Sequence, residues 1–208
     1  MTIPLEIIDL SKTYDTKEAV RDISFKVNEN EIIGILGPNG CGKTTTIGMI
    51  LGLLKPTKGK VLINGIEIEK QRVELLNELN FISPYIELPK KLTVKQNLEV
   101  YGRLYDVKEL GIKIDYLCEK LRLNEFINKI TGELSSGQKN RVSLAKSIIN
   151  DPSVLLLDEP TASLDPETGD FVRSFLEEYQ KEKKTSILLA SHNMLSLIHI
   201  SEPTRRIW

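Results

Sequence analysis

Apolar residues in the first third of the chain form two kinds of run, and both kinds indicate strands. Strand-like runs occupy Leu5–Leu10 and Asp22–Val27, and in the second run apolar and polar residues alternate, as in a half-buried strand. The run Glu31–Leu36 is more continuously apolar, which is typical of a strand covered on both faces. Further strands are predicted at Lys60–Ile68, with a turn at Asn64 and Gly65, at Val154–Leu157 and at Thr185–Ala190.

Helical spacing of apolar residues predicts the remaining elements. Helices are expected at Thr45–Leu54 and Glu167–Lys181, and Thr93 is the expected N-cap of a helix that reaches Tyr105. Two further helices are predicted at Asp115–Leu121 and Gly137–Ile149. We therefore predict an α/β fold in which a mostly helical insertion interrupts the core.

The length of 208 residues suits a single domain made of these parts. We expect the core at residues 1–82 and 151–194, the mostly helical subdomain at 83–150, and an atypical tail at 195–208. Lys and Arg number 28 against 29 Asp and Glu, and this net charge of −1 gives no reason to expect a nucleic acid as partner. The sequence has neither a signal-peptide pattern nor an apolar run near the ~20 residues of a membrane span, so we expect a cytoplasmic protein.

Residues 37–44 read GPNGCGKT and match the phosphate-binding pattern GxxxxGK[ST]. The motif lies between a predicted buried strand and a predicted helix, where successive N–H groups and the helix N-terminus can surround a phosphate. Lys43 is expected to reach the β- and γ-phosphates, and the Thr44 hydroxyl to hold Mg²⁺. The alternative is a glycine-rich turn with a chance lysine, and Cys41 could instead have a redox role. The predicted phosphate-binding residues are Gly37, Pro38, Asn39, Gly40, Cys41, Gly42, Lys43, Thr44 and Thr45.

The strand predicted at Val154–Leu157 leads directly into two acidic residues, Asp158 and Glu159. Ligands of open α/β sheets bind at the carboxyl ends of the strands, where Asp158 is placed to hold Mg²⁺. Glu159 follows by one residue and is placed to polarise an attacking water. A solvated strand end is the alternative for this acidic pair, but the phosphate motif favours the catalytic interpretation.

Further motifs resemble those of ABC-type ATPases. The sequence LSSGQ at residues 134–138 is similar to the LSGGQ signature of that family, with Ser136 where the family usually has glycine. The sequence SLD at residues 163–165 resembles the D-loop, His192 resembles the switch histidine, and Tyr14 resembles the aromatic residue that stacks on adenine. The chain is therefore identified as a member of this family. The resemblance implies a P-loop NTPase (RecA-like) core with an inserted helical subdomain and a small N-terminal antiparallel β part.

The resemblance also implies ATP and Mg²⁺ as cofactors, with Glu159 as general base and His192 and Lys43 as further catalytic residues. Near the predicted helix at residues 137–149, Ser135, Gly137 and Gln138 offer a second anion-binding helix end. In the family two domains pack head to tail, and this end closes over the ATP of the partner. Taken alone, LSSGQ is also typical of an ordinary capped helix, His192 of a structural residue and Tyr14 of a half-exposed aromatic residue.

Two segments depart from the family pattern. The family has a glutamine that touches Mg²⁺ and couples to the membrane partner, whereas Pro84 or Tyr85 stands in its place here, and neither is a good metal ligand. From Leu195 to Trp208 the sequence lacks a usable helical face and is similar to translated adapter read-through. We therefore expect a truncated coding sequence.

Together these features predict an ATP-binding and ATP-hydrolysing subunit of an ABC transporter, most similar to bacterial multidrug and antibiotic-type exporters. The expected partners are a second ATP-binding subunit, in a homodimer or pseudodimer, and separately encoded transmembrane permease subunits. The permease is expected to dock on Ser83–Tyr105 through Tyr85, Ile86 and Leu88, which makes the chain peripheral on the cytoplasmic face of the membrane. The alternatives are a soluble ABC-type ATPase acting on ribosomes or DNA, and a non-hydrolysing regulatory cassette.

Overall fold

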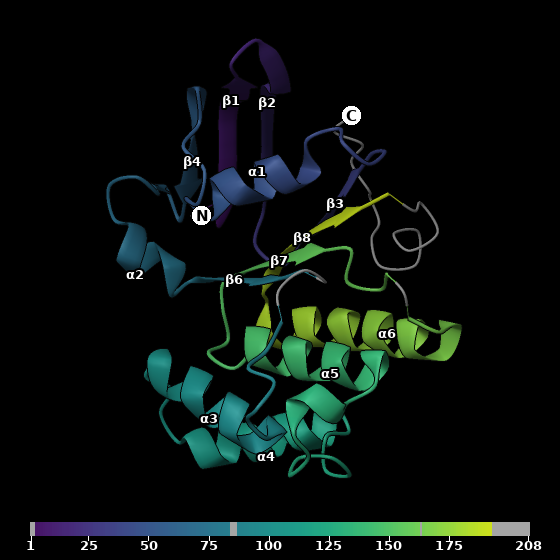
Figure 1. The fold of residues 1–208 in the computed structure, drawn as a ribbon. Coiled ribbons are helices and arrows are strands. Elements are labelled where there is room, and N and C mark those ends of the chain that lie inside the picture. The colour runs from purple at the N-terminus through teal and green to yellow at the C-terminus, as the bar shows by residue number, and fades with distance from the viewer. Residues whose placement is uncertain (1–2, 84–86, 163, 193–208) are drawn as a thin grey trace.

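The computed structural model describes residues 3–83, 87–162 and 164–192, which form two sheets and the helices around them (Figure 1). One sheet is antiparallel, with the strand order β2-β1-β4-β5. Asn64 and Gly65 both have positive φ angles and form the predicted turn between β4 and β5. The strands of this sheet are β1 (Leu5–Tyr14), β2 (Lys17–Val27), β4 (Lys58–Ile63) and β5 (Ile66–Glu67).

The second sheet is parallel, with the strand order β3-β8-β7-β6. Every residue of β7 and β8 is buried, as expected of central strands covered on both faces. Because the strands are parallel, the carboxyl ends of β3, β7 and β8 lie at one edge of the sheet, which brings Gly37, Glu159 and His192 to the same region. The strands are β3 (Ile32–Leu36), β6 (Leu79–Ile82), β7 (Val154–Asp158) and β8 (Ser186–Ser191).

The helices cover the parallel sheet on both faces (Figure 1). On one face, α1 (Lys43–Ile50) lies between the two sheets and shares a buried cluster with Val154 and Leu156 of β7. On the other face, Leu155 and Leu157 of the same strand join a second cluster with α5 (Ser136–Ser147) and α6 (Pro166–Lys183). Alternate residues of β7 therefore anchor α1 above the sheet and α5 and α6 below it.

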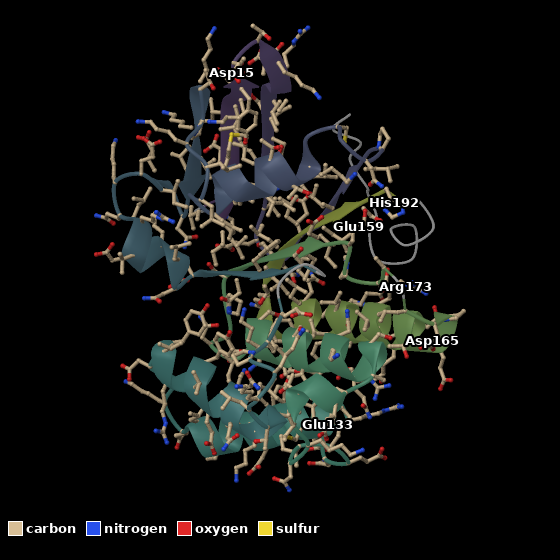
Figure 2. The ribbon with its side chains drawn as sticks, viewed as in Figure 1. Asp15, Glu133, Glu159, Asp165, Arg173 and His192 are labelled. Carbon is tan, nitrogen blue, oxygen red and sulfur yellow. The ribbon has the colours of Figure 1, made fainter. Side chains whose placement is uncertain are left out.

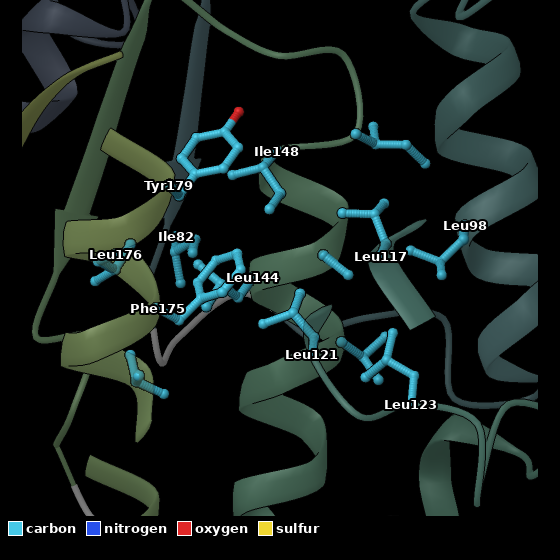
Figure 3. Packing of buried hydrophobic residues seen from close by; sticks show 14 of the residues in the cluster. Ile82, Leu98, Leu117, Leu121, Leu123, Leu144, Ile148, Phe175, Leu176 and Tyr179 are labelled. Carbon is cyan, nitrogen blue, oxygen red and sulfur yellow. The ribbon is translucent and has the colours of Figure 1, made fainter. Parts of the chain in front are cut away.

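The helices α3 (Val94–Leu104) and α4 (Leu110–Lys120) extend the second cluster away from the sheet. Figure 3 shows Leu98 and Leu117 from these helices with Leu144 of α5 and Phe175 of α6 in the same apolar core. Short helical segments lie at α2 (Arg72–Leu76) and at the 3₁₀ turn Thr131–Glu133. In the described ranges, no helix combines the length and the apolar character that crossing a bilayer requires.

The structure confirms the α/β class and the antiparallel part near the N-terminus, and corrects several element bounds. The prediction missed α2 and β6 and placed the start of α4 at Asp115 instead of Leu110. Thr93 caps α3 as predicted: its side chain accepts from the N–H of Gln96, and the side chain of Gln96 accepts from the N–H of Thr93.

Some residues on which predictions were based lie outside the described residues: the tail at residues 195–208, and residues 84–86 and 163. The proposed division into core and subdomain stays a prediction.

Candidate active site

The phosphate loop connects β3 to α1 through backbone conformations that suit glycine. Gly40 and Gly42 have φ angles of 85° and 100°, in the left-handed region that favours glycine. A Cβ on Gly42 would also lie 2.4 Å from the carbonyl oxygen of Ala19 in β2, so only glycine fits there without a shift of the backbone. Gly42 is the N-cap of α1, and no side chain caps this helix. The first N–H groups of α1 are therefore not used by a capping side chain, as a phosphate site requires.

The side chain of Lys43 lies inside this loop. Its side chain is only 6% exposed, and its ammonium group donates to the carbonyl oxygens of Gly37 at 2.6 Å and Pro38 at 3.0 Å. The N–H of Cys41 donates to the same Pro38 carbonyl at 3.3 Å. The loop is thus curled around the ammonium group, which places a cation beside the N-terminus of α1, where an anion would bind.

A cavity of about 290 Å³ opens over the loop and extends to the β1–β2 turn. Tyr14, at one end of this cavity, is 44% exposed, and the ammonium group of Lys12 lies 5.0 Å from its ring centroid. The exposed ring is therefore available to stack on a planar base while the loop holds phosphates. The lining residues are Tyr14, Lys17, Glu18, Ala19, Asn39, Gly40, Gly42, Lys43, Thr44, Thr45, Asp158 and Glu159.

Asp158 and Thr44 face each other across this cavity. The Thr44 hydroxyl donates to Asp158 Oδ2 at 3.5 Å, and Asp158 is 2% exposed. Burial raises the pKa of Asp158, and the negative charge of Glu159 raises it further, while Lys43 and Thr44 oppose the rise. A bound cation would favour the ionised form, because it would neutralise a charge that the protein buries.

These two side chains fit Mg²⁺. A hydroxyl and a carboxylate are the hard oxygen ligands that Mg²⁺ prefers, and in nucleotide sites it takes one or two of them and completes its shell with phosphate and water. Among the described residues, no group of three or more His, Cys, Asp or Glu side chains could hold a metal ion. The pair formed by Thr44 and Asp158 is therefore suited to a cation that arrives with a phosphate group.

Glu159, directly after β7, is held by the residues at the end of β8. Its carboxylate accepts from the Ser191 hydroxyl at 3.0 Å and from the His192 N–H at 2.7 Å, and the His192 ring nitrogen Nδ1 lies 2.5 Å from Oε1. Its backbone N–H donates to Ala190 O at 2.9 Å, and its φ angle of 50° is rare for a residue other than glycine. Figure 2 shows Glu159 and His192 side by side at the ends of these strands. Glu159 is thus oriented by its neighbours, with His192 as a direct partner.

The predicted signature residues begin α5 and lie apart from this cavity. Ser135 is the N-cap of α5: its hydroxyl accepts from the N–H of Gln138 at 3.3 Å, and the Gln138 side chain accepts from the N–H of Ser135 at 3.1 Å. Glu133, two residues before Ser135, lies in the helical part of the molecule, well away from Glu159 (Figure 2). The structure therefore brings Tyr14, the phosphate loop, Asp158, Glu159 and His192 together, but not Ser135, Gly137 and Gln138.

Several residues of this site were not predicted from the sequence. Ser191 binds the Glu159 carboxylate, and Asn140 donates to the carbonyl oxygen of Pro160, the next residue, at 2.8 Å. Lys17 and Glu18 line the cavity because the β1–β2 hairpin pairs Tyr14 with Lys17. For Lys17 and Glu18, the only local indication in the sequence was the short turn between two strand-like runs.

Known proteins resemble this chain in sequence. A sequence profile described as ABC transporter matches residues 20–162. NatA, an ABC transporter ATP-binding protein of Bacillus subtilis (strain 168), is 34% identical over 197 residues, which cover 91% of this chain and 80% of NatA. The Nod factor export ATP-binding protein I of Rhizobium johnstonii is 38% identical over 195 residues, which cover 92% of this chain and 62% of that protein. The chain thus spans less than two thirds of the length of this second relative.

The fold has close counterparts among solved structures. The dimeric structure of MJ0796, a bacterial ABC transporter cassette, aligns with a TM-score of 0.84 at 26% identity and covers 94% of this chain and 90% of that one. A second structure of MJ0796 is described as a post-hydrolysis state bound to ADP and Pi. These matches confirm the predicted P-loop NTPase fold. The chain therefore belongs to the ABC transporter family of ATP-binding proteins.

Proposed function

We propose that the chain binds ATP with Mg²⁺ in the 290 Å³ cavity and hydrolyses it. The observation that carries this proposal is the meeting, at one sheet edge, of the phosphate loop with the acidic pair Asp158 and Glu159. The base stacks on Tyr14, and the phosphates lie along the free N–H groups at the start of α1, next to Lys43. Thr44 and Asp158 would hold Mg²⁺, which would supply charge neutralisation at the phosphates.

Glu159 is the general base in this proposal. Its carboxylate orients a water molecule for in-line attack on the γ-phosphorus and accepts a proton from it, while the bond from that phosphorus to the β–γ bridging oxygen breaks. The Ser191 hydroxyl binds Oε2 and the His192 N–H binds Oε1, so the two donors together fix the orientation of the carboxylate, which lines the cavity. His192, held against Glu159, contacts the transferred phosphate and stabilises its charge.

The working form is a head-to-tail dimer with another ATP-binding subunit. The N-terminus of α5, with Ser135 and Gly137, lies outside the cavity of its own chain, so it can serve a phosphate only across an interface. The dimeric state described for the MJ0796 cassette supports this arrangement. A second copy of this chain or a related subunit would supply the missing end.

The dimer drives separately encoded permease subunits of an exporter, which makes the chain peripheral on the cytoplasmic face of the membrane. The support is the family match and the relatives described as ATP-binding proteins of transporters, one of them a Nod factor exporter. Of the residues predicted to contact the permease in the segment after β6, Leu88 has a different role. Leu88 is 8% exposed and belongs to the buried core, so its side chain contributes to folding more than to an exposed contact. Tyr85 and Ile86 lie outside the described residues.

Glu159→Gln tests both parts of the proposal. The amide keeps the shape of the side chain but cannot accept a proton, so ATP turnover should fall by roughly a hundredfold or more while nucleotide affinity stays within about twofold. Turnover is measured as phosphate release, and affinity by titration with a fluorescent ATP analogue. The tagged variant, purified in mild detergent with ATP present, should retain a polytopic membrane protein as its partner. Retained turnover would contradict the role of Glu159, and ribosomal partners without a membrane protein would contradict the transporter role.

A further inference from the structure

The loop that carries Glu159 is short and strained, and its position depends on contacts from outside. Glu159 has a φ angle of 50°, which a residue other than glycine adopts only when the surroundings enforce it. The N–H of Ala162 closes a turn on the carbonyl oxygen of Glu159 at 3.0 Å. Within this turn, the carbonyl oxygen of Pro160 accepts from the Asn140 side chain at 2.8 Å. The turn is therefore attached to α5 directly next to the general base.

The space beside this turn is open. A cavity of about 310 Å³ separates much of the turn from α5 and from the segment after β6. Residues of one face of α5, Ser136, Asn140 and Ser143, line it on one side, and Glu159, Pro160 and Ala162 line it on another. Close packing from this direction does not immobilise the turn, so a directed hydrogen bond from Asn140 has room to set its position.

The helix α5 is in turn fixed against α6. A Cβ on Gly137 would lie 3.3 Å from Thr168 Cγ2, so the first turns of the two helices are in close contact. One turn further along α5, the Arg141 guanidinium lies 4.9 Å from the ring centroid of Phe171. Ser136–Ser147 is one continuous helix, so the position of Asn140 is fixed relative to that of the first turn. A displacement at Ser135 or Gly137 is therefore carried to Asn140.

We propose that Asn140 is a positioning residue that transmits the state of the α5 N-terminus to Glu159 of the same chain. The inference rests on the proposed function, in which that N-terminus binds the phosphate held by the partner. ATP in the partner's site then draws α5 into one position, and the bond from Asn140 to Pro160 places Glu159 for attack in its own site. Each site thereby becomes fully active when the other is occupied.

The test compares Asn140→Leu with Asn140→Gln in steady-state ATP hydrolysis by the full chain. Leucine keeps the size of the side chain without its donor, so kcat should fall about tenfold while KM for ATP stays within about twofold. The Hill coefficient for ATP should fall toward 1. Glutamine keeps an amide donor, on a longer side chain, so Asn140→Gln should keep most of the kcat that Asn140→Leu loses. Binding of a fluorescent ATP analogue, unchanged in both variants, shows that they are folded.

Asn80→Leu is the matched control. The Asn80 side chain, on β6, donates to the carbonyl oxygen of Ser147 at 2.7 Å. Ser147 is the last residue of α5, at the opposite end of that helix from its N-terminus. This variant should lose stability but keep kcat per folded molecule and the Hill coefficient. A loss of kcat in Asn140→Leu no larger than in Asn80→Leu would overturn the inference, and a loss with an unchanged Hill coefficient would overturn the link between sites. Absence of hydrolysis by the unsubstituted chain would instead overturn the proposed function.

Discussion

Two helices of this protein begin at glycine-containing loops and expose their N-termini, but they do so in different ways. The helix α1 starts at Gly42, in a left-handed conformation and without a side-chain cap. The helix α5 starts at Ser135, in an extended conformation, with a complete capping box. Neither first turn contains an acidic side chain that would offset the helix dipole. Both ends therefore attract anions, and they differ in how many donors remain unused.

This difference assigns the two ends different tasks. At α1 the loop provides N–H groups, the ammonium group of Lys43 and a cavity, so this end can bind a phosphate without help. At α5 the N–H of Gln138 already donates to the Ser135 hydroxyl, so fewer backbone N–H groups can bind a phosphate there than at α1. The end at α5 is therefore suited to complete a site formed by another subunit. Substitution of one glycine at each end should separate these tasks.

Gly42→Ala and Gly137→Ala give the largest expected contrast. Alanine at Gly42 combines a positive φ angle with a Cβ 2.4 Å from Ala19 O, so the loop should shift to relieve a strain of roughly 3 kcal/mol. Restoring the loop when nucleotide binds would then lower ATP affinity by about a hundredfold. Alanine at Gly137 occupies a helical position and meets the Thr168 side chain at 3.3 Å, a contact that a small shift between α5 and α6 relieves. It should leave affinity within about twofold and lower turnover. Titration with a fluorescent nucleotide measures the first effect, and phosphate release measures the second.

The urea midpoint of each variant is the control for this pair. A Gly42→Ala protein that is folded but does not bind nucleotide supports the assignment of the primary site to α1. If Gly137→Ala lost affinity as strongly as Gly42→Ala, the two ends would belong to one site, and the proposed division of tasks would be wrong.

The difference between the two ends also shows what the sequence could predict. The phosphate loop is a contiguous motif between a buried strand and a helix, so both its chemistry and its local structure were predictable. The signature end was predictable as a capped helix start, because Ser135 and Gln138 have capping-box spacing. The ends of the helices were less predictable: α4 begins at Leu110, directly after Glu109, whose positive φ angle no local pattern indicates.

Contacts between distant segments were not predictable. The strand β6 has only four residues and includes Asn80, which is buried because its amide binds Ser147 and Asn150 on another segment. The bond from Asn140 to Pro160 and the one from Ser191 to Glu159 likewise join residues far apart in the sequence. Such bonds depend on the folded arrangement, so a single sequence gives no sign of them.

Ser135→Ala tests the cap of α5 at smaller scale. Removal of the hydroxyl should lower the free energy of unfolding by about 1 kcal/mol, because the N–H of Gln138 loses its acceptor. Thr93→Ala removes an equivalent cap from α3 and should cost a similar amount. Urea unfolding measures both losses. Only Ser135→Ala should also reduce ATP turnover, and an equal reduction in both variants would mean that the cap of α5 acts through stability alone.

Asp158→Asn tests the α1 end through its buried carboxylate. Because burial and Glu159 raise the pKa of Asp158, keeping it ionised costs stability, and the amide should raise the free energy of unfolding by ~0.5 kcal/mol at neutral pH. A carboxyl group with a raised pKa in the folded state holds its proton more tightly there than in the unfolded chain. The free energy of unfolding of the unsubstituted protein therefore falls as the pH rises through the folded-state pKa. The gain in the variant should therefore be larger at about pH 7.5 than at about pH 4. Added Mg²⁺ with ATP should stabilise the unsubstituted protein more than the variant. A variant less stable at neutral pH would show that the fold depends on this carboxylate, whereas a more stable variant without ATP turnover would show that the α1 end keeps it for the cation.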